Sequence, residues 1–397
     1  MKNKKHTYYN LFFLLCIIFI HFDPTGFKIT IGIFFLLSFL FAFFKFKFYN
    51  YAPYSLLLLS FFYPLFIFFY NKELNITFLV FLKPFILYIL SAIIHILIIY
   101  LPIKKNNFDF TSILKPSLIL ILSIVSIQFF SSFIFHKPFL YNLFGIFQYN
   151  NLNPVDELTA NFFPRTQGFY LEPSYLAFVT ITLICISINL NKFTRFSFII
   201  GGLIIFMSGS RGGFLGLFLI LITQLFSNFK FNSFKSYSYF SILLVFGFFL
   251  VIPVLSLLTL ESLTTVNSSQ YVRFYQGFNL STFVLSNYFL GIPLGALEKA
   301  YQISTGETSS IFSFFIFNII YHGWFSFLLL FLIFTKLLFS KIHNNTRVYF
   351  LIYLLLYFNM TGIIISPDTY FWFFCFYYTY RLSKGSIHKQ LDESIYI

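Results

Sequence analysis

The chain of 397 residues is too apolar for a soluble protein, because 58% of it is hydrophobic and only 10% is charged, with a mean hydropathy of +0.83. Soluble domains carry about 25% charged residues. The formal net charge of +14 is better explained by membrane topology than by nucleic-acid binding. The three cysteines (Cys16, Cys185 and Cys375) lie far apart in apolar runs, which favours neither a disulfide framework nor a zinc site.

The first apolar run follows a short basic stretch. Lys2, Lys4 and Lys5 precede Leu11–Ile20, an arrangement that is also typical of a signal peptide. No cleavage site of small residues follows this run, so we expect an uncleaved first membrane-spanning helix.

Similar apolar runs follow along the rest of the chain, separated by short polar stretches. A membrane-spanning helix needs about 20 apolar residues. The predicted fold is therefore all-α, a polytopic transmembrane bundle that forms a single integral membrane domain over 1–397. The twelve predicted spans are 8–22, 29–44, 52–70, 77–102, 114–135, 173–190, 196–207, 212–228, 238–258, 312–334, 348–364 and 370–380.

The basic residues test this threading independently. Twelve spans place both termini on the same side of the membrane. If that side is the cytoplasm, 18 of the 26 Lys and Arg residues are cytoplasmic, whereas nine of the 12 acidic residues are outside. This asymmetry agrees with the positive-inside rule. We therefore expect a bacterial inner-membrane protein with both termini in the cytoplasm.

Two of the predicted periplasmic loops are long, at about 136–172 and 259–311. Loops longer than about 12–15 residues are uncommon unless they carry function or are disordered. Both loops mix aromatic and polar residues, so we expect short amphipathic helices that lie at the outer surface. No internal repeat is evident, which argues against transporter folds built from inverted repeats.

The first candidate site lies where the first long loop meets the sixth span, in the sequence Arg165-Thr-Gln-Gly-Phe-Tyr-Leu-Glu-Pro-Ser-Tyr. Pro173 suits the first position of a helix. Glu172 would then be the N-cap, where a carboxylate meets free backbone N–H groups. The alternative is that Glu172 is only a cap and Arg165 only a solvated loop charge.

The second candidate site is the turn Ser208-Gly-Ser-Arg-Gly-Gly, between the seventh and eighth spans. Residues 196–228 number 33, whereas two full passes need about 40. We therefore expect the turn with Arg211 to lie below the outer membrane surface, where a guanidinium usually faces a polar cavity or a partner. The alternative is that Arg211 extends to the interface along its own apolar stem.

The third candidate is Arg273 in the second long loop, which is followed by Gly291-Ile-Pro-Leu-Gly. By itself Arg273 is as well explained as a solvated loop residue. Together, three arginines and Glu172 on the outer side suggest an anionic lipid-linked substrate, because the planar guanidinium matches phosphate oxygens and a carboxylate can act as a general base. No DxD, HExxH, P-loop or GxSxG motif is present, so metal or nucleotide chemistry is unsupported.

In their order, spacing and sidedness these motifs resemble the bacterial O-antigen polymerase and ligase superfamily. That superfamily carries R-x-x-G and E/x-P-[NS] at an outer helix start, then a T/S-x-S-R-[GA] turn, and then an arginine in a large outer loop before a lone helix. The resemblance covers about 165–325. The matching residues are Arg165, Gly168, Glu172, Pro173, Ser174, Ser208, Ser210, Arg211, Arg273, Gly291, Gly295, His322 and Gly323.

The resemblance implies a membrane glycosyltransferase that acts at the periplasmic face, without metal or other cofactor, on oligosaccharides linked to undecaprenyl diphosphate. Its partners would be this substrate, membrane lipid and, as a further candidate, a chain-length regulator. Diphosphate is already a good leaving group, so the protein must mainly position it and neutralise developing charge. The implied catalytic residues are Glu172, Arg211 and Arg273, and the implied substrate-binding residues are Arg165, Gly168, Tyr170, Ser210 and His322.

One departure from the superfamily favours the polymerase over the ligase. Ligases carry a His-Asn pair at the start of the helix after the large loop, where this chain has Ser309-Ser-Ile-Phe-Ser. We therefore expect a repeat-unit polymerase for O-antigen or capsule, with Glu172 as first candidate for the general base and His322 as second. The ligase is the closest rival. A flippase or other transporter is the rival from a different class, although transporters more often carry charges midway along several helices, and a non-catalytic scaffold is the last alternative.

Overall fold

The computed structural model describes about two fifths of the chain, in continuous ranges and as single residues. Over these residues all regular structure is helical. This agrees with the predicted all-α class. The described residues are 11, 14–15, 17–18, 52–89, 111–135, 166, 168, 170, 173–190, 192–227, 276–305, 314–326, 328, 335 and 349. The predicted spans 29–44, 238–258 and 370–380 lie outside them, as do most residues of 8–22 and 348–364, and so the predicted number of spans stays a prediction.

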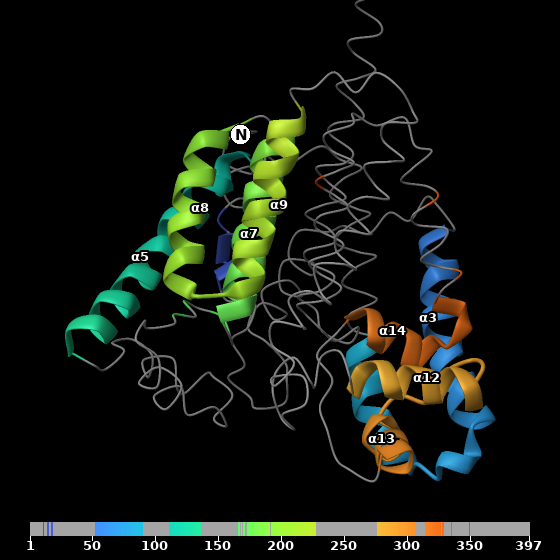
Figure 1. The fold of residues 1–397 in the computed structure, drawn as a ribbon. Helices are drawn as coiled ribbons and strands as arrows, with labels where there is room; N and C mark the ends of the chain where they lie inside the picture. The colour runs from blue at the N-terminus through green and yellow to red at the C-terminus, as the bar shows by residue number, and fades with distance from the viewer. Residues whose placement is uncertain are drawn as a thin grey trace, which may run out of the picture.

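The first group of described helices, drawn in teal to yellow-green in Figure 1, contains one helix that is buried along most of its length. The group comprises α5 (Thr111–Phe135), α7 (Pro173–Asn189), α8 (Thr194–Ser208) and α9 (Arg211–Ser227). Every residue of α7 from Leu176 to Ser187 is buried, and α7 packs against α5, α8 and α9. A helix that is apolar all round can be buried in this way.

Two glycines allow the neighbours of α7 to approach it closely. A Cβ atom on Gly201 of α8 would lie 2.5 Å from Ile184 Cδ1, and one on Gly213 of α9 would lie 2.8 Å from Ala177 Cβ. Small residues at such positions bring helix backbones together, as is common between membrane helices.

The lengths of these helices bear on how they would cross a bilayer. Among the described residues, α5 is the one helix both long and apolar enough to cross a membrane, judged by length and composition. Helices α8 and α9 have 15 and 17 residues, or about 22 and 26 Å, against about 30 Å for a hydrocarbon core. The α8–α9 hairpin is therefore shorter than two full passes. Gly209, at φ +60°, ends α8 with its N–H donated to the Phe206 carbonyl.

The second group of helices joins two parts of the chain that are far apart in the sequence. It comprises α3 (Ala52–Tyr70), the 3₁₀ helix η1 (Lys72–Leu74), the helix Phe78–Ile89, α12 (Gly277–Asn287), α13 (Leu297–Thr305) and α14 (Phe314–His322). Helices α12 and α13 lie within 259–311, the predicted second periplasmic loop.

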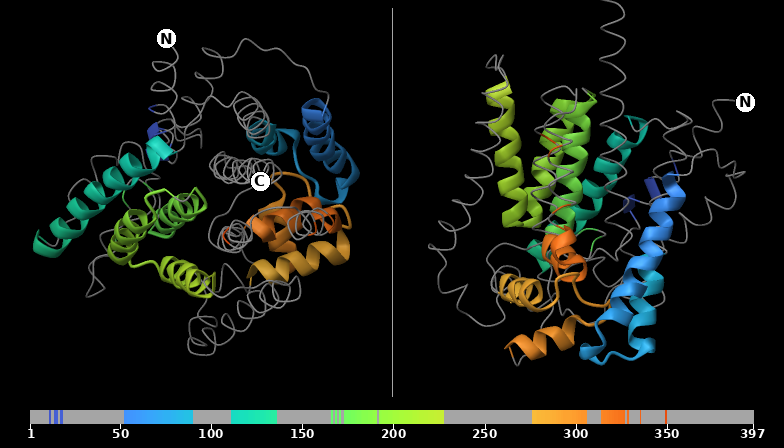
Figure 2. Two further views of the ribbon diagram at one scale, coloured as in Figure 1. Left: turned by 90° about the horizontal axis from the view of Figure 1, so that it is seen from above. Right: turned by 90° about the vertical axis from the view of Figure 1, so that its right-hand side faces the viewer.

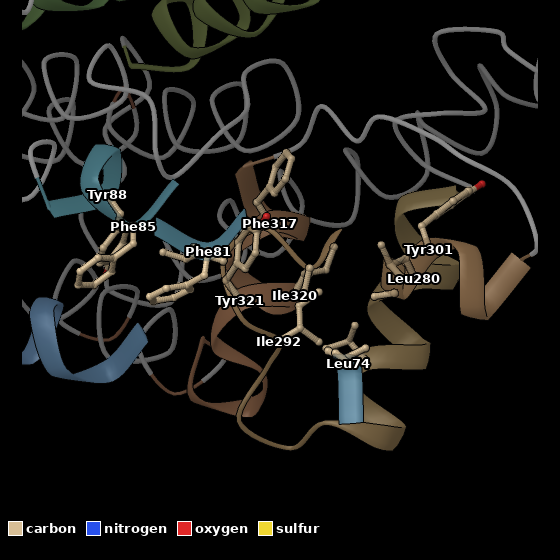
Figure 3. Close-up of a cluster of buried hydrophobic side chains, with 14 residues drawn as sticks. Leu74, Phe81, Phe85, Tyr88, Leu280, Ile292, Tyr301, Phe317, Ile320 and Tyr321 are labelled. Atoms are coloured by element: carbon tan, nitrogen blue, oxygen red, sulfur yellow. The ribbon is translucent and has the colours of Figure 1, made fainter. Parts of the chain in front are cut away.

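A shared apolar core holds this second group together (Figure 3). Phe81 stacks on Phe68 at 4.4 Å and on Phe85 at 5.0 Å between ring centroids. The partners from the later part of the chain include Leu280, Ile292, Tyr301, Ile320 and Tyr321. Side chains of residues 276–305 thus pack against side chains of η1 and of the helix Phe78–Ile89.

The helix ends that the sequence predicts to face outward lie toward one end of the molecule. Figure 1 shows the C-terminal ends of α3, α5 and α8 and the N-terminal ends of α7 and α9 toward the lower end, where α12 and α13 also lie. The right-hand view of Figure 2 shows the same arrangement for α3, α7, α9, α12 and α13. We call this part of the molecule the loop end, defined by those helix ends together with residues 276–305.

Candidate functional site

Thr166 ties the first candidate motif to the last turn of α8. Its backbone N–H and its hydroxyl both donate to the Met207 carbonyl, at 3.2 and 3.0 Å. Carbonyls in the last turn of a helix lack partners within that helix, so they are open to such donors. Arg165, the residue before Thr166, lies outside the described residues, as does Arg273. The bonds bring the motif to a point four residues before Arg211 in the chain.

Gly168 is held by the side chain of a buried glutamine on α5. The Gly168 N–H donates to Gln128 Oε1 at 2.9 Å, and Gln128 Nε2 donates to the Gly168 carbonyl at 3.0 Å. Gly168 has φ +62°, and a Cβ there would lie 3.2 Å from Val125 Cγ2, so glycine is favoured and any other residue would be strained. The resemblance implies that Gly168 binds substrate, whereas the structure places it in a buried position with both backbone groups bonded.

Tyr170 and Ser210, the other two predicted binding residues of this region, also have their polar groups occupied. Tyr170 is fully buried and its hydroxyl donates to the Ile17 carbonyl at 3.2 Å. Burial raises the pKa of this hydroxyl above its ordinary value, which keeps it neutral. Ser210 is buried, and its hydroxyl accepts the Gly213 N–H at 3.3 Å. Ser210 is therefore the N-cap of α9.

Helices α7 and α9 lie side by side near their N-terminal ends, at the loop end. Helix α7 begins at Pro173, as predicted, and α9 begins at Arg211. Gly213 packs against Ala177 at this point, so the free N–H groups and positive dipole ends of both helices face the same region. Glu172 and the side chain of Arg211 lie outside the described part of the structure. The described neighbours nevertheless bring together motifs that are some forty residues apart in the sequence.

The third motif forms a backbone-to-backbone contact in the second helix group. Gly291 has φ +91°, and a Cβ there would lie 2.5 Å from the Tyr321 carbonyl carbon. The Ile292 N–H donates to the Ile320 carbonyl at 2.9 Å, and the Trp324 N–H donates to the Phe289 carbonyl at 3.1 Å. Residues 289–292 therefore lie directly against the end of α14.

Two polar side chains of the α3 region hold the same turn from the other side. Asn71 Nδ2 donates to the Gly291 carbonyl at 2.6 Å, and the Tyr63 hydroxyl donates to the Leu290 carbonyl at 2.7 Å. His322 stacks on Tyr63 with 5.4 Å between ring centroids, and its Nδ1 lies 3.3 Å from the Asn318 carbonyl. His322 thus belongs to the second group, whereas Gly168, Tyr170 and Ser210 belong to the first.

Sequence reasoning missed Gln128, Tyr63 and Asn71. Each is a polar residue in or directly after a predicted span, and such residues usually face the interior of a bundle. That signal could have predicted that Gln128 is buried and hydrogen-bonded, although it could not have predicted that Gly168 is its partner. Among the described residues, no cluster of His, Cys, Asp and Glu could hold a metal ion.

Comparison with known proteins decides the class. The chain matches the WcaD colanic acid polymerase family over residues 9–382. It belongs to this family. No curated protein matches the chain, and no solved structure does. The predicted resemblance to O-antigen and capsule polymerases is confirmed. The WcaD-family chain is a polysaccharide polymerase and hence a glycosyltransferase, and its helical structure with an apolar α5 fits a membrane protein.

Proposed function

We propose that this WcaD-family polymerase transfers the growing glycan from undecaprenyl diphosphate to the next lipid-linked repeat unit, at the periplasmic face of the inner membrane. The observation that carries this proposal is the meeting of two motifs at the loop end. Thr166 is bonded to Met207, and Ala177 near the start of α7 packs on Gly213 near the start of α9. Three predicted site residues lie next to these contacts in the chain. Arg165 precedes Thr166, Glu172 precedes the first residue of α7, and Arg211 is the first residue of α9.

The diphosphate would be bound by guanidinium groups and by helix N-termini. Arg211 is the first residue of α9, and Arg165 precedes Thr166. Arginine binds phosphate oxygens in a bidentate manner, and helix N-termini attract anions through their free N–H groups. Arg273, from the second long loop, would supply a further positive charge. These groups would offset the negative charge that grows on the leaving diphosphate.

The depth of the α8–α9 turn suits a substrate that is anchored in lipid. Because α8 and α9 span only about 22 and 26 Å, their turn would lie below the surface reached by the longer α5. A prenyl diphosphate carries its phosphates at the membrane interface, close to such a turn. A soluble sugar donor would gain nothing from that depth.

In the proposed reaction a hydroxyl oxygen of the acceptor sugar attacks the anomeric carbon of the donor glycan. The bond from that carbon to the diphosphate oxygen breaks, and undecaprenyl diphosphate leaves with the electron pair. The hydroxyl proton passes to a general base, for which Glu172 is the first candidate and His322 the second. Gly168, Tyr170 and Ser210 would act by positioning the chain around these groups, since their described polar groups are already bonded.

Deletion of the gene separates the polymerase from the ligase. We expect the deletion strain to lose long-chain surface polysaccharide while still making single repeat units. If the product is O-antigen, lipid A-core should carry one repeat unit, seen as a single band above the core on a gel. Loss of all capped lipid A-core, with lipid-linked polymer accumulating, would instead identify a ligase. Restoring the gene on a plasmid is the control.

The proposed periplasmic site also requires the predicted topology. A reporter fused after Lys235 should behave as cytoplasmic, and a reporter fused near Ser268 should behave as periplasmic, because the positive-inside rule places these positions on opposite sides. Paired alkaline phosphatase and green fluorescent protein fusions measure this directly. Both positions on one side would contradict the twelve-span topology.

A further inference from the structure

The glutamine on α5 and the glycine of the first motif form a closed pair of hydrogen bonds in a buried place. Gln128 is 1% exposed, and its amide uses one donor and one acceptor on the two backbone groups of Gly168. Amide side chains offer both a donor and an acceptor. The Gln128 side chain alone therefore bonds both the N–H and the carbonyl of Gly168, which lies in neither a helix nor a strand. We call this pair the Gln128 clamp.

The clamp holds Gly168, which lies midway along the segment 165–172, between its two predicted site residues. Arg165 precedes Gly168 by three residues, and Glu172 follows it by four. The other described anchors of the segment are Thr166 on Met207 and Tyr170 on Ile17. Without the clamp, Thr166 and Tyr170 would still be bonded, but Gly168 between them would not. The backbone conformation of Gly168 sets the direction in which the chain leaves it on either side.

Loss of the clamp would act on the segment rather than on the helix. Helix α5 is also packed against α7 and α8, and its residues Ile121 and Val125 are fully buried there. Removing the amide would leave the Gly168 N–H and carbonyl buried without these partners, which is unfavourable. Because α5 is held by this packing as well, we expect the segment to be the part that shifts.

We propose that Gln128 is a positioning residue of the polymerase, which sets the backbone at Gly168 so that Arg165 and Glu172 reach the lipid-linked substrate together. The inference rests on the proposed function. It makes Gln128 necessary for transfer although its amide is hydrogen-bonded to the Gly168 backbone and not to substrate. A glutamine that merely filled space could be replaced by leucine without loss.

Three variants separate positioning from packing. Gln128→Leu keeps the volume and removes both bonds. Gln128→Glu restores the clamp only when the carboxyl is protonated, because a protonated carboxyl has a donor and an acceptor whereas a carboxylate has acceptors alone. Ser123→Ala is the matched control, since the Ser123 hydroxyl donates only to the Ile119 carbonyl of its own helix.

This pH test requires that the introduced carboxyl, and no other charged group near the clamp, accounts for the difference from wild type. Helix α7 carries no charged residue. The charged residues of α5 and α8, Lys115 and Arg195, lie near the opposite, N-terminal ends of those helices. Arg165 and Glu172 are the charged residues nearest in sequence to the held glycine, and both are present in the wild type as well as in the variant. An effect of pH on the Gln128→Glu variant, relative to wild type, would therefore report the introduced carboxyl.

The experiment uses membranes from a deletion strain that carries each variant, supplied with that strain's own radiolabelled lipid-linked repeat units. We expect Gln128→Leu to lower polymer synthesis at least about tenfold at every pH, at equal protein level on an immunoblot. Gln128→Glu should be as poor at mildly alkaline pH and should recover, relative to wild type, as the pH is lowered. Ser123→Ala should match wild type. Amide hydrogen exchange of purified protein should be faster in 166–170 for Gln128→Leu, with α8 unchanged.

Wild-type synthesis by Gln128→Leu, or a ratio of Gln128→Glu to wild type that does not change with pH, would overturn the proposal. If Gln128→Leu is absent from the membrane, the pH ratio of Gln128→Glu alone decides. Failure of the proposed function would look different, because the wild type itself would then make no polymer from these units.

Discussion

Replacing Arg211 with alanine is expected to abolish polymerisation while the amount of protein in the membrane stays close to that of the wild type. Arg211 begins α9 beside the start of α7, in a turn that we expect to lie below the outer membrane surface because α8 and α9 are shorter than full passes. The variant loses a bidentate partner for the diphosphate, and loss of one such charge-stabilising group lowers rates by about 100-fold or more. Packing should change little, because Ser210 caps α9 without help from the arginine.

Conservative and matched variants sharpen this test. Arg211→Lys should restore little activity, because an ammonium keeps the charge and loses the planar fork. Arg273→Ala should be impaired in the same direction and less severely. Arg195→Ala is the control, because Arg195 is an exposed arginine in the first turn of α8, away from the loop end.

The measurement is the length of the polymer ladder on a gel, together with the immunoblotted protein level. A normal ladder from Arg211→Ala would show that Arg211 only extends to the interface, and the anion-site assignment would be wrong. Loss of the protein from the membrane would give Arg211 a structural role instead.

Replacing Gly323 with alanine is expected to destabilise the protein strongly. Gly323 follows α14 at φ +53°, where an alanine is strained, and its Cβ would overlap the Phe289 carbonyl oxygen and lie 2.6 Å from the Gly291 N. These neighbours belong to the backbone of residues 289–292, which is held by hydrogen bonds to Asn71, Tyr63 and Ile320, so they have little freedom to yield. We expect a loss of about 3 kcal/mol or more in the free energy of unfolding.

The matched control is Gly202→Ala in the middle of α8. A Cβ there meets nothing within 4 Å, so alanine should be neutral or stabilising by up to about 1 kcal/mol through its better helix propensity. The measurement is the midpoint of thermal denaturation of each purified variant in detergent. Equal midpoints for the two variants would contradict the close contact between residues 289–292 and the end of α14.

Sequence alone determined those features that depend on a short stretch of chain. The all-α class follows from apolar runs of helical length. The start of α7 at Pro173 follows from the preference of proline for the first helical position. The short α8–α9 hairpin follows from counting residues between polar stretches, and the superfamily motifs led to the class that the WcaD-family match confirms. For the helices the physical cause is local, and each superfamily motif is itself a short stretch of neighbouring residues.

Tertiary structure alone decided which polar groups near the motifs are already occupied. Gly168, Tyr170 and Ser210 have the residue types of a binding site, yet their described groups are bonded within the protein. Their partners lie elsewhere: Gln128 is 40 residues from Gly168, and Tyr63 is 227 residues from Leu290. The physical reason is that an unsatisfied buried amide or hydroxyl takes whichever partner the packing of distant helices brings to it, and no local pattern of residues encodes that partner.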